Sequence, residues 1–278
     1  MGLWFTVFFA APLVIIVLYS FLTKRLHGGV TWIPALRAYA ELANPNILRI
    51  TAHTFGTAAL ATLITIILAL PCGYFMAKSK HQALLLMVII VPFWTNFLIR
   101  VFAWINILGN NGFLNVFLMR LGVVKDYIPF LYNQGAVVLV LVYMYLPYAI
   151  LPLFASIDKF DFSLLEAARD LGATKQGAIW RILFPSIKSG IYTAVLFTFI
   201  PIFGAYAVPL LVGGKDSYML GNVIADQLGK SRNWPLASSI SMVLTLATTI
   251  GVLVMLGLQR KTETGKQKPE NKKQKGEI

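Results

Sequence analysis

The chain has 278 residues, of which 58% are hydrophobic and 13% are charged, and it carries a formal net charge of +13 at pH 7. About a quarter of the residues in a soluble domain are charged, so this composition excludes an ordinary water-soluble protein and indicates a membrane protein. The single cysteine, Cys72, excludes an internal disulfide framework.

Six apolar segments are long enough to cross a lipid bilayer, because a hydrocarbon core of about 30 Å requires about 20 helical residues. They are Leu3–Leu22, Thr54–Ala77, Ala83–Leu108, Gly135–Ile157, Ile191–Val212 and Leu236–Leu258. Backbone in contact with lipid must satisfy its own hydrogen bonds, so the sequence predicts an all-α membrane protein with six transmembrane helices. The first segment is interpreted as a retained span, because its apolar run is too long for a signal peptide.

The third segment contains a polar patch that follows a proline. Pro92 frees a backbone carbonyl, and Asn96 lies one helical turn beyond it on the same side. None of the six segments contains Asp or Glu, so a cationic solute would have to contact aromatic faces, amides and carbonyls. We expect Trp94, Asn96, Tyr143 and Tyr206 to line a pathway. The alternative is that the aromatic residues lie at the membrane interfaces and that Asn96 joins neighbouring helices.

A polar island, residues 158–188, separates the fourth and fifth segments. Ser163 and Glu166 have the Ser-x-x-Glu spacing of a capping box, which predicts that Ser163 caps a short helix. The apolar residues at i, i+4 and i+7 on one face of this helix are Leu164, Ala168 and Leu171. Gly172 is suited to end the helix in a left-handed conformation.

A second short helix is predicted to follow this glycine. Thr174 is expected to cap it, and Pro185 is expected to end it. Its apolar stripe consists of Ile179, Ile182 and Leu183. This unit is too short to be a domain and too polar to lie in lipid, so we expect it either to dock on another protein or to lie on lipid headgroups.

The order of residues in this island resembles the EAA loop of ABC-importer permeases. The matching residues are Glu166, Ala167, Ala168, Gly172 and Pro185. The resemblance implies that they belong to coupling helices that insert into a groove of a cytoplasmic ATPase. Our hypothesis is that Glu166 pairs there with a basic residue of the ATPase. A role for Glu166 as a helix cap alone remains the alternative.

Three stretches, residues 91–100, 164–174 and 221–235, resemble spermidine/putrescine permeases of the PotB type. The resemblance implies a type I importer (MetI-like) fold and polyamine uptake across the bacterial cytoplasmic (inner) membrane. It also implies a second, PotC-like permease subunit, two ATPase subunits and an extracytoplasmic polyamine-binding protein. The alternatives are a permease for another small solute and a stand-alone secondary carrier. A carrier would be expected to have intramembrane ionisable groups or two related halves.

The predicted organisation has three parts: a first helix and extracytoplasmic loop in residues 1–53, a permease core in residues 54–258 with its coupling loop at 158–190, and a Lys-rich tail in residues 259–278. With both termini in the cytoplasm, fourteen Lys and Arg residues lie on the cytoplasmic side and ten on the other, a small excess in the direction of the positive-inside rule. The resemblance to the EAA loop, which must face the ATPase, decides for this orientation. Asp216 and Asp226 then lie in the last outer loop, where they either meet an incoming cation or the binding protein or remain solvated.

The sequence predicts no catalytic site, no metal and no cofactor. His27, His53 and His81 are scattered, and Gly213-Gly214-Lys215 lacks the first glycine and the hydroxyl of a phosphate-binding loop. We therefore expect a separate subunit to hydrolyse ATP. The tail lysines have no interleaved aromatic residues, so we expect contact with membrane lipid and no nucleic acid.

Overall fold

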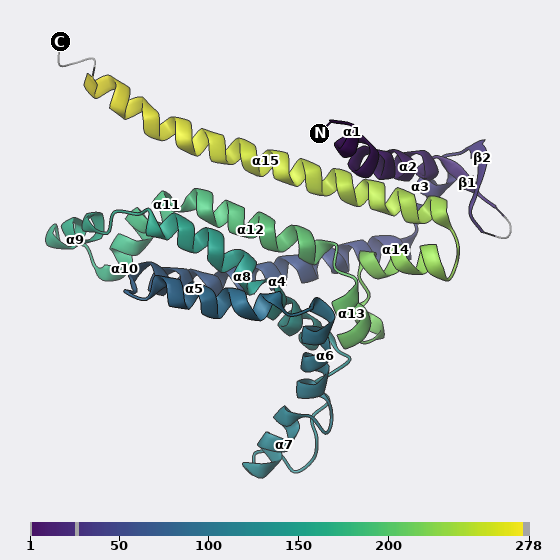
Figure 1. Cartoon of the computed structure of the whole chain (residues 1–278), viewed down its shortest axis with the longest axis horizontal. Coiled ribbons are helices and arrows are strands. Elements are labelled where there is room, and N and C mark those ends of the chain that lie inside the picture. Colours follow the sequence, from purple (N-terminus) through teal and green to yellow (C-terminus); the bar gives the residue numbers. More distant parts are fainter. Residues whose placement is uncertain (1, 26–27, 275–278) are drawn as a thin grey trace. The chain divides into compact units, whose positions relative to one another are not determined.

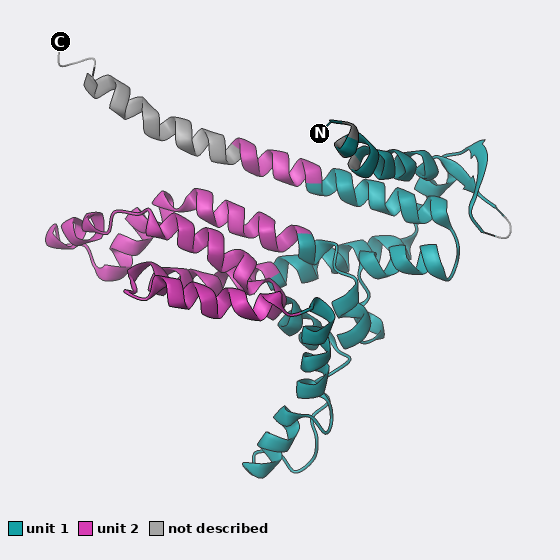
Figure 2. Cartoon of the chain, viewed as in Figure 1, with its two compact units in different colours: residues 1–61, 96–141, 201–248 teal, residues 62–95, 142–200, 249–278 magenta. Residues whose placement is uncertain are grey.

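The computed structural model describes residues 2–25 and 28–274, and it describes side chains up to residue 257, apart from three near the N-terminus. The chain divides into two compact units, which are coloured separately in Figure 2. Unit 1 contains residues 1–61, 96–141 and 201–248, and unit 2 contains residues 62–95, 142–200 and 249–278. Four helices, labelled in Figure 1, contribute residues to both of the units coloured in Figure 2: α4 (Pro45–Lys78), α8 (Gln134–Asp158), α12 (Lys188–Phe203) and α15 (Trp234–Gln274).

Unit 1 combines short helices with a two-stranded antiparallel sheet. Its other elements are α1 (Gly2–Phe5), the π-helical turn η1 (Thr6–Ala10), α2 (Ala11–Ser20), β1 (Leu22–Lys24), β2 (Val30–Pro34), α3 (Arg37–Leu42), α6 (Phe97–Leu108), α7 (Phe113–Arg120), α13 (Ala207–Val212), the 3₁₀ turn η4 (Lys215–Ser217) and α14 (Leu220–Gly229). In the sheet, Thr23 lies opposite Thr31 and Lys24 lies opposite Val30. The sequence analysis did not predict this hairpin, α7 or α14.

Unit 2 is built around a tightly packed apolar core. Its shorter elements are α5 (Gln82–Ile90), the 3₁₀ turn η2 (Val91–Trp94), α9 (Ser163–Asp170), α10 (Lys175–Ala178), the π-helical turn η3 (Ile179–Leu183) and α11 (Phe184–Ser186). Ala69 of α4, Ala149 of α8 and Ala194 of α12 are completely buried in this core. Small residues let helices approach closely, and a Cβ atom on Gly190 would collide with Ser156.

Among the residues that the structure describes, four helical stretches are long and apolar enough to cross a membrane: Pro45–Lys78, Phe97–Arg120, Gln134–Asp158 and Trp234–Gly257. A fifth is possible if Lys175–Ser186 and Lys188–Phe203, which are bent by 71°, form one span. The predicted second, fourth and sixth segments lie within α4, α8 and α15. The helical membrane architecture is therefore confirmed, whereas six spans remains a predicted number.

The first predicted segment is less regular than its composition suggests. The structure divides it among α1, the π-helical turn η1 and α2, and it ends the helix at Ser20. Leu22 belongs to strand β1, so the prediction of one continuous helix to Leu22 is wrong.

The third predicted segment is interrupted, so the prediction of one continuous helix over Ala83–Leu108 is wrong. After the 3₁₀ turn η2, Thr95 and Asn96 adopt extended conformations with ψ values of 147° and 139°, and α6 begins at Phe97. The Thr95 hydroxyl donates to the Pro92 carbonyl at 2.6 Å, which closes the turn. Pro92 lacks the N–H that would continue the hydrogen bonding of the preceding helix, and Asn96 caps a new helix. The segment therefore consists of two separate helices and not of one bent helix.

The fifth predicted segment is also two helices. Helix α12 ends at Phe203, and α13 begins at Ala207 after a short non-helical stretch. Pro201 lies in the last turn of α12, and Gly204 follows that turn; both residues weaken helical continuation. The predicted tail, residues 259–278, falls where side chains are not described, and residues 275–278 and His27 lie outside the described residues.

Candidate functional site

The polar loop between α8 and α12 forms the predicted helix–turn–helix unit, but its first cap differs from the prediction. Helix α9 begins at Ser163, so this residue occupies the first helical position and not the cap position. The Asp161 carboxylate accepts a hydrogen bond from the Ser163 N–H at 3.0 Å. Hydrogen bonds from the side chain and backbone of Ser163 hold the pKa of Asp161 below its ordinary value. The predicted capping box of Ser163 and Glu166 is therefore wrong, because Glu166 lies one position too far into the helix.

The turn after α9 confirms the prediction for Gly172. This residue has a φ of +89°, in the left-handed region that penalises other residues. Its N–H donates to the Arg169 carbonyl at 2.9 Å, and the Ala173 N–H donates to the Ala168 carbonyl at 2.9 Å. This pair of bonds is a Schellman motif, which satisfies the last carbonyls of α9 and fixes the direction in which the chain leaves it.

The second helix begins as predicted and ends one residue beyond the predicted stop. The Thr174 hydroxyl oxygen accepts a hydrogen bond from the Gly177 N–H at 3.1 Å and caps α10. The π-helical turn η3 follows, and α11 carries the helix through Pro185 to Ser186. The bend of 71° into α12 therefore falls at Ile187. A π-helical turn is often found at functional positions, where it changes the direction of a helix locally.

The inner face of this loop is fixed to unit 2 by apolar packing. Leu165 of α9, Leu183 of η3 and Ile187 are at most 7% exposed, and they pack with Tyr74 near the end of α4. The predicted stripe of the second helix is confirmed, since Ile179 and Ile182 join Leu183 in this cluster. The loop is therefore attached to the helical core and does not hang freely from its two ends.

Polar and aromatic contacts add to this attachment. The Lys78 Nζ atom, at the end of α4, lies 5.0 Å from the centroid of the Phe162 ring and 5.5 Å from that of Tyr74. The Gln82 amide nitrogen donates to the Ala77 carbonyl at 3.1 Å and to the Asp158 carboxylate at 2.9 Å. The sequence analysis missed these residues. A basic residue at the end of a span and a glutamine at the start of a helix are too common to indicate a contact.

The outer face of the loop exposes the residues of the EAA pattern. Glu166, Ala167 and Gly172 are exposed, whereas Ala168 and Pro185 are half-buried. Apolar side chains are also exposed here: Leu164 at 48%, Leu171 at 90% and Trp180 at 68%. Exposed apolar side chains grouped within a polar segment are typical of a surface that binds another protein. A hollow of about 70 Å³ lies beside this face, and Glu166 contributes to its lining.

The four predicted pathway residues are divided between the two units. Trp94 and Tyr143 belong to unit 2, whereas Asn96 and Tyr206 belong to unit 1. Trp94 is 85% exposed at the end of η2, and Tyr143 is 36% exposed on α8. Asn96 is exposed, and its side-chain oxygen accepts a hydrogen bond from the Leu98 N–H at 2.8 Å, so it caps α6. Tyr206 is 45% exposed, and its carbonyl accepts a hydrogen bond from Asn222 at 3.0 Å.

Other aromatic residues near Tyr143 contact one another. Phe93 of η2 meets the ring of Tyr148 edge to face, with 5.9 Å between centroids. Tyr145 and Tyr148 are 5.7 Å apart and tilted. The sequence analysis missed this pair. The spacing of three residues between Tyr145 and Tyr148 could have indicated it, because residues at i and i+3 lie on the same side of a helix.

The two acidic residues of the last predicted outer loop have different surroundings. The Asp226 carboxylate lies 2.8 Å from Lys230 Nζ and accepts a hydrogen bond from the Tyr218 hydroxyl at 2.7 Å. The hydrogen bonds from Lys230 and Tyr218 hold the pKa of Asp226 below its ordinary value. Asp216 instead lines an open hollow of about 350 Å³ together with Arg49. The charge of Asp226 is thus compensated within the chain.

A solved ABC transporter chain shares this fold, and the family match together with the PotB relatives shows that this chain is the transmembrane permease subunit of an ABC importer. The chain belongs to the family of binding-protein-dependent transport system inner membrane components, which it matches over residues 61–265. It is therefore a multi-pass inner-membrane protein.

Similar proteins cover almost the whole chain. The spermidine/putrescine transport system permease protein PotB of Escherichia coli (strain K12) is 38% identical over 253 residues, which is 90% of this chain and 92% of that protein. PotB of Haemophilus influenzae is 34% identical over 253 residues, covering 90% and 88%. A chain of a bacterial alginate ABC transporter, solved in complex with an alginate pentasaccharide-bound periplasmic protein, superimposes with a TM-score of 0.75 at 16% identity, covering 93% and 91%. The last comparison supports the MetI-like permease fold alone.

Proposed function

We propose that this chain translocates polyamines, spermidine or putrescine, across the cytoplasmic membrane as a subunit of an ATP-driven importer. The observation that carries the proposal is its 38% identity to PotB over 90% of the chain. The likeness extends well beyond the EAA loop, which permeases for different solutes share.

The proposed importer contains a second, PotC-like permease subunit, two ATPase subunits and an extracytoplasmic polyamine-binding protein. The family description names dependence on a binding protein, and the similar alginate transporter was solved with a periplasmic protein. We assign ATP hydrolysis to the separate subunits and no nucleotide site to this chain. Gly213-Gly214-Lys215 does not match a phosphate-binding loop.

In the proposed coupling mechanism, the outer face of the polar loop docks on an ATPase subunit. The docking residues are Glu166, Ala167, Ala168, Gly172 and Pro185. The small side chains of the two alanines permit close approach, and exposed Leu164 and Leu171 supply apolar contact area. Closure of the ATPase dimer would move α9 and η3 together, since both pack in one apolar cluster. The motion would pass through the bend at Ile187 into α12.

The proposed pathway uses aromatic faces and amide oxygens, because polyamines are flexible chains of ammonium groups. Trp94, Asn96, Tyr143 and Tyr206 are its candidate residues. All four expose at least a third of their surface in this single chain, so they are accessible to a solute or to a second permease subunit. Ammonium groups bind over aromatic rings with about 0.5–2 kcal/mol each.

We place both termini in the cytoplasm, so that the polar loop faces the ATPase. The excess of Lys and Arg on that side supports this orientation. The proposed organisation is a first helix and outer loop in residues 1–53, a permease core in residues 54–258 containing the coupling loop 158–190, and a cytoplasmic Lys-rich tail in residues 259–278.

A cellular assay tests the proposal. The chain is expressed with its partner subunits in bacteria that lack their own polyamine importers, and radiolabelled spermidine and putrescine are supplied at low concentration. We expect accumulation that stops when this chain is omitted. Normal expression and assembly without accumulation of either polyamine would discard the substrate and leave the permease assignment intact.

A further inference from the structure

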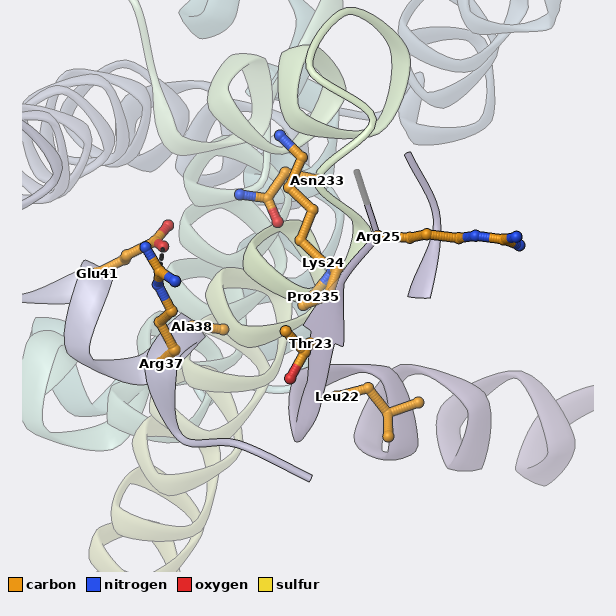
Figure 3. Close-up of a pocket in the computed structure, with 9 residues that line it drawn as sticks. All are labelled: Leu22, Thr23, Lys24, Arg25, Arg37, Ala38, Glu41, Asn233 and Pro235. Atoms are coloured by element: carbon orange, nitrogen blue, oxygen red, sulfur yellow. Dashed lines mark ion pairs between the residues drawn. The ribbon is translucent and has the colours of Figure 1, made fainter. Parts of the chain in front are cut away.

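Unit 1 contains a polar hollow of about 440 Å³ beside the β1–β2 hairpin (Figure 3), a volume typical of small-ligand sites. Its walls come from three parts of the chain: the end of β1, helix α3 and the start of α15. Leu22 and Ala38, which are 8% and 6% exposed, contribute apolar surface to the lining. The hollow is thus a concave polar site beside buried apolar residues.

The lining of this hollow is predominantly cationic. Lys24, Arg25 and Arg37 line it, against the single carboxylate of Glu41. Arg25 points away from the other labelled side chains in Figure 3, whereas Lys24 extends alongside Asn233. Arg37 Nε lies 3.8 Å from Glu41, and the Arg37 side chain is 83% exposed, so this loose pair leaves guanidinium donors accessible. Lys24 and Arg37 are therefore available to an anion, while a polyamine cation would be repelled.

Apolar side chains close to these cations in the sequence are strongly exposed. Trp32 is 74% exposed, Ile33 is 60% exposed and Leu36 is 67% exposed. They lie in β2 and in the connection to α3, within five residues of Arg37. Tryptophan and aliphatic residues next to lysine and arginine are typical of a segment at the boundary between lipid headgroups and acyl chains.

The hairpin is held firmly in place, so the hollow is preformed. The Tyr39 hydroxyl donates to the Ser20 hydroxyl at 2.8 Å, and the rings of Phe21 and Tyr39 are 5.3 Å apart. The Ala35 N–H donates to the Phe21 carbonyl at 2.8 Å. These contacts join the end of α2, the hairpin and α3 within unit 1.

We propose that this hollow binds the phosphodiester headgroup of an anionic phospholipid, with Lys24 and Arg37 contacting the phosphate and Trp32, Ile33 and Leu36 lying at the acyl boundary. Charge complementarity selects an anion, and the adjacent exposed apolar side chains select a lipid over free phosphate. The hairpin begins two residues after the apolar helix α2, which keeps it close to the membrane surface if that helix lies in lipid. The inference is independent of the transported substrate and of which side of the membrane the hairpin faces.

Native mass spectrometry of the full chain tests the proposal, with phosphatidylglycerol and phosphatidylcholine as probes. We expect the protein to retain phosphatidylglycerol in preference. The Lys24→Gln/Arg37→Gln double variant should bind it about 25-fold more weakly, because each basic residue near an anionic membrane contributes about fivefold. The matched control is Arg120→Gln/Lys125→Gln, which removes two exposed basic residues elsewhere in unit 1 and should bind normally. Equal affinity in both double variants would overturn the proposal, and displacement of the lipid by inorganic phosphate would reject the lipid as ligand.

Fluorescence gives a second readout that does not depend on the charge variants. The emission of Trp32 is obtained as the difference between the spectra of the wild type and of Trp32→Phe. In vesicles that contain brominated phosphatidylglycerol, we expect this emission to be quenched. Brominated phosphatidylcholine should quench it less. If aqueous acrylamide quenched Trp32 and the brominated lipids did not, the face would be open to a soluble partner and the lipid proposal would be wrong.

Discussion

The Nζ atom of Lys78 lies 5.0 Å from the centroid of the Phe162 ring, and this contact joins the end of α4 to the connection between α8 and α9. Phe162 also meets Tyr74 edge to face, with 6.0 Å between ring centroids. The polar loop is thus bound to α4 laterally, in addition to its covalent connections to α8 and α12. Movement of the loop by a partner would be transmitted to three helices of unit 2.

Replacement of Lys78 by methionine tests this lateral connection. Lys78→Met keeps most of the apolar stem but removes the charge of this exposed side chain, so cation–π contacts of about 0.5–1 kcal/mol are lost. We expect faster amide hydrogen exchange in residues 163–186 and fewer polyamines imported per ATP hydrolysed. Lys80→Met, which changes an exposed lysine in the turn that follows α4, is the control. Identical exchange rates in the two variants would show that the Lys78 contact does not stabilise the polar loop.

Replacement of Gly172 by alanine tests the turn between the two short helices. Nothing lies within 4 Å of the position of a Cβ atom on Gly172, so the expected loss comes from its φ of +89° alone and amounts to about 1–2 kcal/mol. Thermal unfolding should therefore shift to lower temperature. Gly229→Ala has the same open surroundings without a positive φ, so it should unfold at the wild-type temperature or slightly above it. Equal unfolding temperatures for the two variants would contradict the strained turn.

Replacement of Glu166 by glutamine separates its two candidate roles. Because Asp161 and not Glu166 supports the start of α9, we expect Glu166→Gln to leave the free energy of unfolding within about 0.5 kcal/mol of the wild type. Polyamine uptake by the assembled complex should fall, since the variant removes the charge that pairs with the ATPase. Asp170→Asn, exposed on the same helix, is the control. Unchanged uptake with Glu166→Gln would reject the proposed ion pair.

Asn96 has a structural role that must be separated from its proposed contact with the substrate. Asn96→Leu removes the cap of α6 and should cost about 1 kcal/mol of stability, whereas Asn96→Ser retains a capping oxygen. If Asn96 lines the pathway, both variants should raise the substrate concentration needed for half-maximal uptake. If uptake rate and affinity stayed normal for Asn96→Leu in an assembled complex, the lining proposal would be wrong for this residue.

The contact of Asp226 with Lys230 and Tyr218 should make the stability of the α14 region depend on pH. The folded pKa of Asp226 lies below 3.8, so the stabilisation is fully present above that value and is lost as the pH falls through the folded pKa. The pKa of Lys230 is raised above 10.5, because its ammonium donates to Asp226, so the same contact is lost only at strongly alkaline pH. Hydrogen exchange of α14 should accelerate at acid pH in the wild type. Asp226→Asn should already show fast exchange at pH 7, and wild-type protection in that variant would contradict the assignment.

Uninterrupted apolar runs made α8 predictable to within one residue at each end, since the predicted segment was Gly135–Ile157 and the helix is Gln134–Asp158. The breaks at Thr95 and after Phe203 were not predicted, because proline inside an apolar run is compatible with both a kink and an interruption. Only the neighbouring cap at Asn96 distinguishes the two outcomes in the third segment.

The candidate site was predictable where the signals are local. Gly172 and Thr174 act through residues at most five positions away, and both predictions are confirmed. The contact between Gln82 and Asp158 joins residues 76 positions apart, which no local pattern specifies. The capping box failed because Asp161, two residues before Ser163, supplied a competing acceptor.

Uptake of radiolabelled spermidine into proteoliposomes tests the central claim most directly. The vesicles contain this chain, its partner permease and the ATPase with internal ATP, and the binding protein is added outside. The account predicts uptake that requires every subunit and that putrescine, but not an unrelated amino acid, reduces by competition. ATP-dependent activity of the assembled complex without spermidine or putrescine uptake would contradict the proposed substrate, and uptake by this chain alone would contradict ATP-driven coupling through the polar loop.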